Sequence, residues 1–276
     1  MTTATAWLNE LNSFFTPTST QFDSARGHRA SIETRLNSNL GVSEMFEIGS
    51  LRHGTGVFVY SDADYLVSLK GFRPESSITM LNKVKESLQG RFTSTSIGVR
   101  RPAVVANFSD GVVEVVPAYA NAGGGYWIAD PRGGWMLTHP KNHNDWVNSV
   151  NSKHNGAAKK LARQLKVWKY KRNVPVSSCY LEMRAAKHMD GESSYLPTWD
   201  LHAALKKLHD NSLAAMNDPT GLGSRFTAYS SDASKADALS KLSTAVARAA
   251  KAKVYDAAGD NDSAVAQLRL LFNRPA

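Results

Sequence analysis

An α+β fold is predicted, because strand patterns and helix patterns occupy different parts of the chain. Short apolar runs rich in β-branched residues concentrate between residues 45 and 116. From residue 157 onward, apolar residues instead recur every three or four positions, as they do on one face of a helix. A chain of 276 residues can form one large domain or two modest ones. We therefore expect a sheet-containing domain with N-terminal helices over residues 1–155 and a helical domain over residues 156–276.

The first elements are two helices followed by two strands. Residues 6–15 carry apolar side chains at helical spacing, and Pro17 stops that helix. A second helix, which Ser19 or Thr20 can cap, runs to about Leu40. Short apolar or alternating runs then predict two strands, at residues 45–48 and 64–69.

The middle of the chain predicts a helix and then the rest of the sheet. Pro74 and Ser76 begin a helix that runs through Leu88. Asp110-Gly111 is a turn signal, so the strands on either side of it are expected to form a hairpin. The three strands expected here cover residues 93–99, 103–108 and 112–116. Residues 123–135 then form a glycine-hinged hairpin whose aromatic side chains either stack on a nucleobase or pack the hairpin onto the sheet.

The remainder is expected to be helical. A polar cap or a proline marks the start of most of these helices. The helices begin near His139-Pro140, Ala157, Ser177-Ser178, Thr198 or Asp200, Ser231-Asp232 and Asp260-Asn261. The helix from Thr198 or Asp200 is expected to run through Met216, and Val254 is expected to face inward on the helix from Ser231-Asp232.

One stretch near the N-terminus carries the chemistry. Gly49-Ser50 follows an apolar run, and glycine allows both a tight turn and a close approach of the backbone to a ligand. If that ligand carries a phosphate group, the Ser50 hydroxyl can point at the phosphate as well. Asp62 and Asp64 are two residues apart, so on a strand both project from one face. Two adjacent carboxylates repel unless a cation lies between them, and oxygen ligands suit Mg²⁺ or Mn²⁺.

A third acid lies within an apolar strand. Glu114 is flanked by valines on both sides, and a buried carboxylate must be neutral, paired or bound to a metal. The alternative is that Glu114 faces solvent at a sheet edge. We favour the metal role, which makes Glu114 the third candidate ligand.

Charge and composition restrict the partners. Lys and Arg number 33 against 24 Asp and Glu, a formal net charge of +9 that favours anionic partners such as nucleotides or nucleic acid. No apolar run is long enough to span a membrane, and the N-terminus lacks the basic region of a signal peptide. The chain has one cysteine, which suits a reducing compartment. We therefore expect a cytoplasmic protein with no membrane partner.

The pattern G-S-x-x-x-G-T-x-V-x-x-x-S-D-x-D over residues 49–64 resembles the nucleotidyltransferase superfamily of the DNA polymerase β type. Later segments narrow the resemblance to the bacterial cGAS/DncV-like nucleotidyltransferases, the CD-NTases of CBASS anti-phage defence. Those segments are Val112 to Pro117, Gly133-Gly134-Trp135 with His139-Pro140-Lys141, Lys166 to Lys169, and Ser178 to Glu182. The family more often has Asp where this chain has Glu114. The resemblance implies a mixed-sheet nucleotidyltransferase core, a second, all-helical lobe and an active site in the cleft between them.

The resemblance also assigns roles to residues. Asp62, Asp64 and Glu114 would be catalytic and would hold two Mg²⁺ ions, with Mn²⁺ as an alternative. The triphosphate of a nucleotide would be bound by Gly49, Ser50, Lys166, Lys169 and Ser178. In these enzymes a lysine and a serine from successive helices act together, and Lys166 and Ser178 are our choice for that pair. Ser177 would then cap the helix.

The implied activity is template-independent synthesis of a cyclic di- or trinucleotide second messenger from nucleoside triphosphates in anti-phage signalling. A downstream effector would respond to the messenger and need not contact the enzyme, and nucleic acid binding is possible but not required. Transfer of nucleotides to an RNA or protein acceptor is the alternative, and an inactive nucleotide or RNA sensor is less favoured because the acids are retained. The bases, linkage, ring size, activating signal and oligomeric state stay open at this stage.

Overall fold

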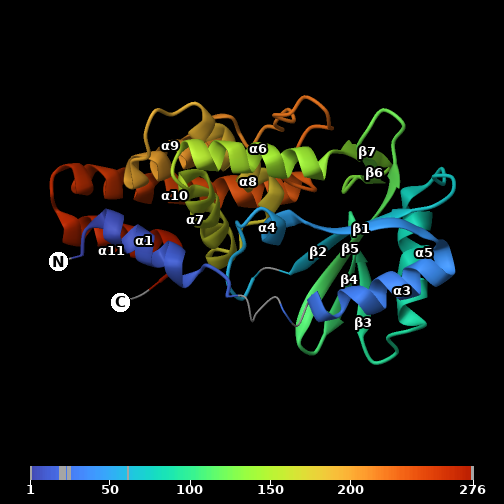
Figure 1. The fold of residues 1–276 in the computed structure, drawn as a ribbon. Coiled ribbons are helices and arrows are strands. Elements are labelled where there is room, and N and C mark those ends of the chain that lie inside the picture. The colour runs from blue at the N-terminus through green and yellow to red at the C-terminus, as the bar shows by residue number, and fades with distance from the viewer. Residues whose placement is uncertain (1, 19–22, 24–25, 61, 275–276) are drawn as a thin grey trace.

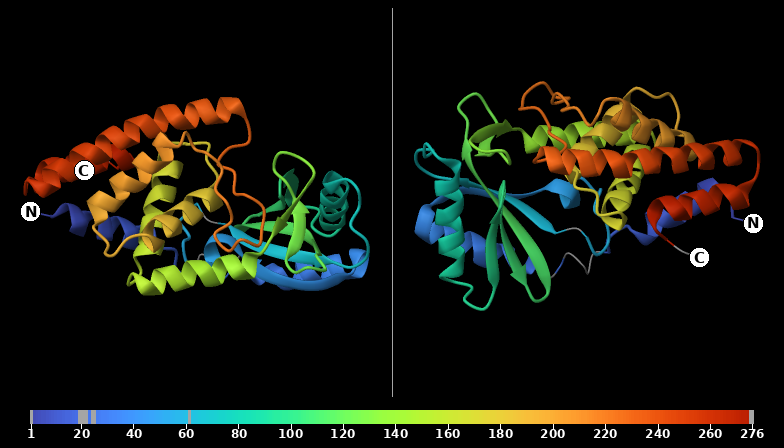
Figure 2. Two further views of the ribbon diagram at one scale, coloured as in Figure 1. Left: turned by 90° about the horizontal axis from the view of Figure 1, so that it is seen from above. Right: turned by 180° about the vertical axis from the view of Figure 1, so that it is seen from behind.

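The computed structural model describes residues 2–18, 23, 26–60 and 62–274, which form two lobes side by side (Figure 1). One lobe contains a seven-stranded sheet with helices on one face, and the other is a bundle of helices. Seen from above and from behind, the sheet lobe and the helical lobe keep to opposite ends of the molecule (Figure 2). The α+β fold with a second, all-helical lobe is therefore confirmed.

The sheet is mixed. Its main path runs β1-β2-β5-β4-β3, and β6 pairs with β5 and β7. The pairing of β2 with β5 is parallel, whereas the other strand pairs are antiparallel. The strands are β1 (Val42–Ile48), β2 (Ala63–Leu69), β3 (Ser96–Arg100), β4 (Ala103–Phe108), β5 (Gly111–Ala120), β6 (Tyr126–Ala129) and β7 (Trp135–Thr138).

Helices α3 (Arg29–Leu40) and α5 (Ser77–Gln89) cover one face of the sheet. Ile32 and Leu36 of α3 join α5 and the odd-numbered residues of β2 and β5, such as Tyr65 and Val115, in one buried cluster. The even-numbered residues point to the opposite face, where Leu66 and Val116 belong to a separate cluster. Asp64 and Glu114 are also even-numbered, so they lie on the face that α3 and α5 leave uncovered.

Local signals determine where several elements begin and end. β4 and β5 form the expected hairpin, with Phe108 paired to Gly111 across a two-residue turn. Ser177, Ser231 and Asp260 cap their helices, because each side chain accepts a hydrogen bond from a backbone N–H in the first turn. The possible caps Ser19 and Thr20 lie outside the described residues.

The helical lobe is assembled around one large buried cluster. Its helices are α1 (Ala4–Phe14), α6 (Pro140–Lys153), α7 (Ala157–Lys171), α8 (Ser178–Asp190), α9 (Pro197–Asp210), α10 (Asp232–Ala257) and α11 (Asn261–Phe272). The cluster crosses the division expected between residues 155 and 156, because Leu8 of α1 and Val147 of α6 belong to it. Trp7 lies 5.9 Å from Phe272 between ring centroids, so α1 packs on the last helix of the chain. Apolar periodicity shows which face of α1 is buried but not which part of the chain covers it.

Helical patterning also misplaces the end of α9. The expected helix to residue 216 ends at Asp210, where Asn211 and Ser212 begin a turn. Within the described part of the chain, no helix has the length and hydropathy needed to cross a bilayer.

Candidate active site

Three acids converge at one end of the sheet. Asp64 is the second residue of β2 and lies opposite Glu114 in the parallel pairing with β5, while Asp62 immediately precedes β2. One carboxylate oxygen from each of the three side chains lies within 4.8 Å of the others. The structure thus brings together Asp62, Asp64 and Glu114, as the sequence predicts.

The Gly49-Ser50 turn lies directly against this cluster. β1 ends at Ile48, which is paired with Asp64, and the short helix α4 (Gly49–Arg52) follows at once. Gly49 has a φ of 67°, and a Cβ atom at this position would lie 2.3 Å from Oδ2 of Asp64. Glycine is therefore required here both by backbone conformation and by the close approach of the carboxylate.

The surroundings of Asp64 disfavour an isolated negative charge. Burial raises the pKa of Asp64 well above its usual value, and the neighbouring charge of Asp62 raises it further. The cations Lys166 and Arg100 act in the opposite direction but do not cancel these effects. A cation placed between the acids would stabilise the ionised form of this side chain.

Arg100 contacts two of the acids, and the sequence does not predict these contacts. Its guanidinium lies 3.2 Å from Oδ2 of Asp62 and also contacts Glu114. Arg100 is the last residue of β3, at the edge of the sheet. No periodicity or motif links this residue to the acids, because they meet only through the strand order.

Lys169 and Ser178 form a second group near the acids. Nζ of Lys169 donates to Oγ of Ser178 at 2.7 Å, and the Tyr170 hydroxyl lies 3.2 Å from the same oxygen. Burial lowers the pKa of Lys169 to about 8, and the charge of Lys166 contributes to this shift, whereas Asp62 opposes it. The Tyr170 ring stacks on Tyr60, two residues before Asp62, with 4.7 Å between centroids. The helical lobe therefore presents a lysine and a hydroxyl next to the carboxylates.

Lys166 has a different environment from the expected one. Its side chain is only 1% exposed, and Nζ donates to the Thr55 carbonyl at 3.0 Å and lies 3.4 Å from Glu182. His53 and the Thr55 hydroxyl hydrogen-bond to the same Glu182 carboxylate. Burial by itself raises the pKa of Glu182, but the charges of His53 and Lys166 outweigh it and lower the pKa to about 2. Ser178 is thus paired with Lys169 and not with Lys166.

Helix α7 also fixes the loop between the turn and the two aspartates. Arg163 donates to the carbonyl oxygens of Gly54 and Gly56, each at 2.9 Å. Arg163, Lys166 and Lys169 are spaced by three residues, so they follow one another along α7. This spacing is the only sequence signal for a contact between α7 and the 53–57 loop, and it does not identify the partner residues.

The aromatic residues of the β6–β7 hairpin pack rather than line the site. Trp127 pairs with Tyr119 of β5, five positions beyond Glu114, which is roughly 16 Å along a strand. The Trp135 indole donates to the Glu75 carbonyl at 3.0 Å, and Tyr126 is buried with its hydroxyl on Glu44. The packing alternative for this hairpin therefore describes the structure.

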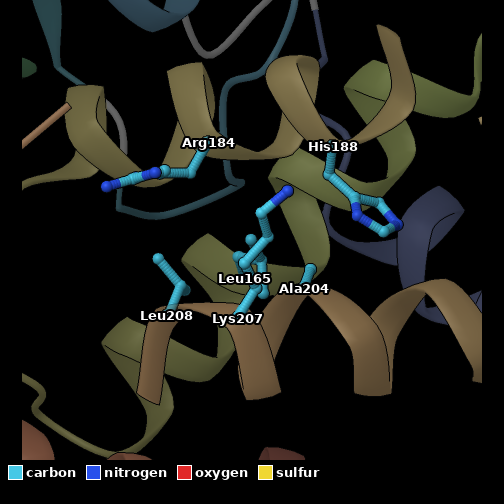
Figure 3. A pocket seen from close by; sticks show the side chains of 6 residues that line it. All are labelled: Leu165, Arg184, His188, Ala204, Lys207 and Leu208. Atoms are coloured by element: carbon cyan, nitrogen blue, oxygen red, sulfur yellow. The ribbon is translucent and has the colours of Figure 1, made fainter. Parts of the chain in front are cut away.

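A second group with metal-ligand side chains occurs in the helical lobe. His188, Glu192 and Asp200 also place one ligand atom each within 4.8 Å. There, Asp200 already accepts from His188 at 2.8 Å and from the Leu196 backbone N–H at 2.6 Å, so its oxygens stabilise the start of α9. The cavity beside His188, between α7, α8 and α9, has a volume of about 10 Å³ (Figure 3). It holds at most about one water molecule and is too small for a nucleotide.

The chain is similar in sequence to one protein family and to curated proteins. Residues 1–151 match the family described as the Second Messenger Oligonucleotide or Dinucleotide Synthetase domain, SMODS. A cyclic AMP-AMP-AMP synthase of Acinetobacter sp. is 32% identical over 106 residues, which are 37% of this chain and 31% of that protein. A probable cyclic nucleotide synthase of Bacillus cereus is 29% identical over 116 residues, 39% of this chain and 35% of that protein. The matched regions thus span about a third of the length of these curated relatives.

Solved structures extend the similarity to the whole fold. The structure of CdnC from E. coli MS115-1 with ATP superimposes with a TM-score of 0.72 at 16% identity, covering 96% of both chains. CdnG from Bradyrhizobium diazoefficiens in complex with GTP gives a TM-score of 0.70 at 11% identity and covers 98% of both chains. These likenesses establish the two-lobed fold. Because the family match covers more than half of the chain, the chain belongs to the SMODS family.

Proposed function

We propose that this protein is a template-independent nucleotidyltransferase that makes a cyclic di- or trinucleotide second messenger from nucleoside triphosphates in anti-phage signalling. The observation that carries the proposal is the convergence of Asp62, Asp64 and Glu114 beside the Gly49-Ser50 turn. Family membership and the names of the curated synthases agree with it.

The three acids fit a divalent cation. They offer only oxygen ligands, the set that Mg²⁺ and Mn²⁺ prefer, and their oxygens are close enough to share an ion. A metal cation bound between Asp62 and Asp64 would stabilise the ionised form of the buried Asp64 carboxylate, whose pKa is raised by burial and by the charge of Asp62. Two bound Mg²⁺ ions would supply activation of an acceptor ribose hydroxyl and charge neutralisation at the leaving pyrophosphate.

The remaining site residues would bind and orient the triphosphate. Lys169 and Ser178 provide a cation and a hydroxyl on the helical lobe, 2.7 Å apart. The Gly49-Ser50 turn provides backbone next to Asp64, and Lys166 with Arg163 holds the loop that follows the turn. In-line positioning of this kind contributes to the rate without further covalent chemistry by the protein.

The proposed product determines the partners. Nucleoside triphosphates are the substrates, and two successive transfers give first a linear and then a cyclic oligonucleotide. The messenger would reach its effector by diffusion, so direct contact between the two proteins is not needed. Synthesis would take place in the cytoplasm, where nucleoside triphosphates are abundant.

Product analysis tests the proposal. The full chain is incubated with all four ribonucleoside triphosphates and Mg²⁺, treated with phosphatase, and analysed by mass spectrometry for cyclic products without free phosphate ends. We expect the wild type to form such a product and Asp62→Asn/Asp64→Asn to lose at least about 10³-fold in rate, because charge stabilisation at the reacting phosphate is lost. Asp237→Asn, an exposed change in α10, serves as the matched control.

Two outcomes would overturn the proposal. Unchanged synthesis by the double variant contradicts the assignment of the acids, provided that circular dichroism shows both proteins folded. Incorporation of labelled nucleotide only into added RNA, or into a protein, would establish the alternative acceptor class instead.

A further inference from the structure

A positively charged side chain already lies between two of the three acids. The guanidinium of Arg100 is 3.2 Å from Asp62 and contacts Glu114 as well. Arg100 belongs to β3, and β4 lies between β3 and the Glu114 strand, so the side chain reaches across a neighbouring strand. Its contacts are with two of the carboxylates that would bind a metal ion.

A guanidinium and a metal ion cannot lie in the same gap between two carboxylates at once. A metal ion bound between these acids needs oxygen lone pairs at about 2.0–2.1 Å for Mg²⁺, which leaves no room for a guanidinium in the same gap. Arginine also cannot relieve the conflict by losing its proton, because it remains charged at all relevant pH values. Displacement of the side chain is the remaining solution.

We propose that Arg100 is a built-in counter-ion that occupies the metal position between Asp62 and Glu114 and is displaced when a divalent cation binds. The inference rests on the proposed function, since it concerns the same three acids. The Arg100 side chain makes the affinity of the site for metal lower than the carboxylates alone would give. It also keeps the acids together when metal is scarce.

The geometry makes the displacement easy. The Arg100 side chain is 65% exposed, whereas the Asp62 and Glu114 side chains are 27% and 14% exposed. An ion pair with one exposed partner is weak, so a divalent cation can replace it with only a few-fold loss of affinity. The backbone of Arg100 pairs with Ala103 in the β3–β4 ladder, so only the side chain has to move.

Titration with Mn²⁺ alone tests this inference. Free Mn²⁺ is measured by electron paramagnetic resonance with the full chain, without nucleotide, for the wild type and for Arg100→Ala and Arg100→Lys. We expect Arg100→Ala to bind Mn²⁺ about fivefold more tightly, and Arg100→Lys to lie between it and the wild type, because lysine keeps the charge but not the planar fork.

Arg101→Ala is the matched control. It removes a neighbouring positive charge, but among the described residues Arg101 has no ion pair with the three acids. Its Mn²⁺ affinity is therefore expected to stay within about twofold of the wild type. An equal gain in Arg100→Ala and Arg101→Ala would show a general effect of charge and would overturn the proposal, as would an unchanged or weaker affinity in Arg100→Ala.

The failure of this inference and that of the proposed function can be told apart. If Asp62→Asn/Asp64→Asn abolishes Mn²⁺ binding while Arg100→Ala leaves it unchanged, the metal site stands and only the role of Arg100 is wrong. If the double variant binds Mn²⁺ as the wild type does, the acids are not the metal site and both proposals fail.

Discussion

Lys166 and Lys169 are one helical turn apart on α7, and the structure gives them different surroundings. Lys166 is 1% exposed and is held by Thr55 and the Glu182 carboxylate. Lys169 contacts only uncharged groups among its close described partners, the Ser178 hydroxyl at 2.7 Å and the Tyr170 ring. One lysine therefore has its charge compensated inside the protein, and the other does not.

These different surroundings indicate which lysine positions a loop and which one binds a ligand. A buried cation that already has a carboxylate partner gains little from an anionic ligand, whereas a cation without one is stabilised by it. Burial lowers the pKa of Lys169 to about 8, which is the behaviour expected of an uncompensated ammonium. We infer that Lys166 holds the 53–57 loop and that Lys169 binds the triphosphate.

The largest effect is a loss of stability, expected when the buried ion pair between Lys166 and Glu182 is broken. Lys166→Met leaves Glu182 without its lysine, and loss of one partner of a buried ion pair costs about 3–5 kcal/mol of unfolding free energy. Urea denaturation followed by circular dichroism measures this change. Lys166→Met/Glu182→Leu should recover part of the loss, because no uncompensated carboxylate remains. A single variant as stable as the wild type would contradict the structural role.

The second effect concerns nucleotide affinity. Lys169→Met should weaken binding of a non-hydrolysable ATP analogue about tenfold, the lower range for loss of a hydrogen bond between charged groups. Its unfolding free energy should change much less than that of Lys166→Met. Isothermal titration calorimetry with Mg²⁺ present measures the affinity, and Lys206→Met on α9 is the control. If Lys169→Met binds the analogue normally, the contrast between the two lysines is lost.

The smallest effect is a pH dependence. If Lys169 binds the triphosphate, its ammonium form would do so, and this form is lost as pH rises through about 8. Affinity for the analogue should therefore fall about fivefold between pH 7.5 and 9 in the wild type, as the protonated fraction decreases. Lys169→Arg remains charged over this range and should show a flatter profile. Parallel profiles for the two proteins would assign the pH dependence to another group.

Local sequence information was sufficient for the elements of the fold and for the three acids. Asp62 and Asp64 have the spacing of one strand face, and Glu114 is conspicuous as an acid within an apolar strand. Helical periodicity places Lys166 and Lys169 near each other but does not say which one meets an acid. That distinction depends on Glu182 and Thr55, which approach only in the folded chain.

Other features depend on tertiary contacts from the start. Arg100 reaches the acids because β3 is ordered after β4 in the sheet, and nothing in its flanking residues indicates this. The same reason explains why α1 joins the helical lobe, since Leu8 has the periodicity of a buried residue wherever its partner lies. Val254, expected to face inward, is 60% exposed because it is only two positions from the buried Ala252 and therefore lies on another side of α10.

The parallel register of β2 and β5 has a consequence for how this chain tolerates changes in length. Side chains alternate between the two sides of a strand, so one residue inserted between Gly111 and Glu114 would turn the third acid toward the apolar layer under α5. The connection of residues 70–76 contacts the sheet through Arg73 and the Glu75 carbonyl, but it carries none of the three acids and follows β2, so a change in its length would not rotate a ligand. Natural insertions and deletions should therefore accumulate in that connection and be absent from the few residues that lead into each carboxylate.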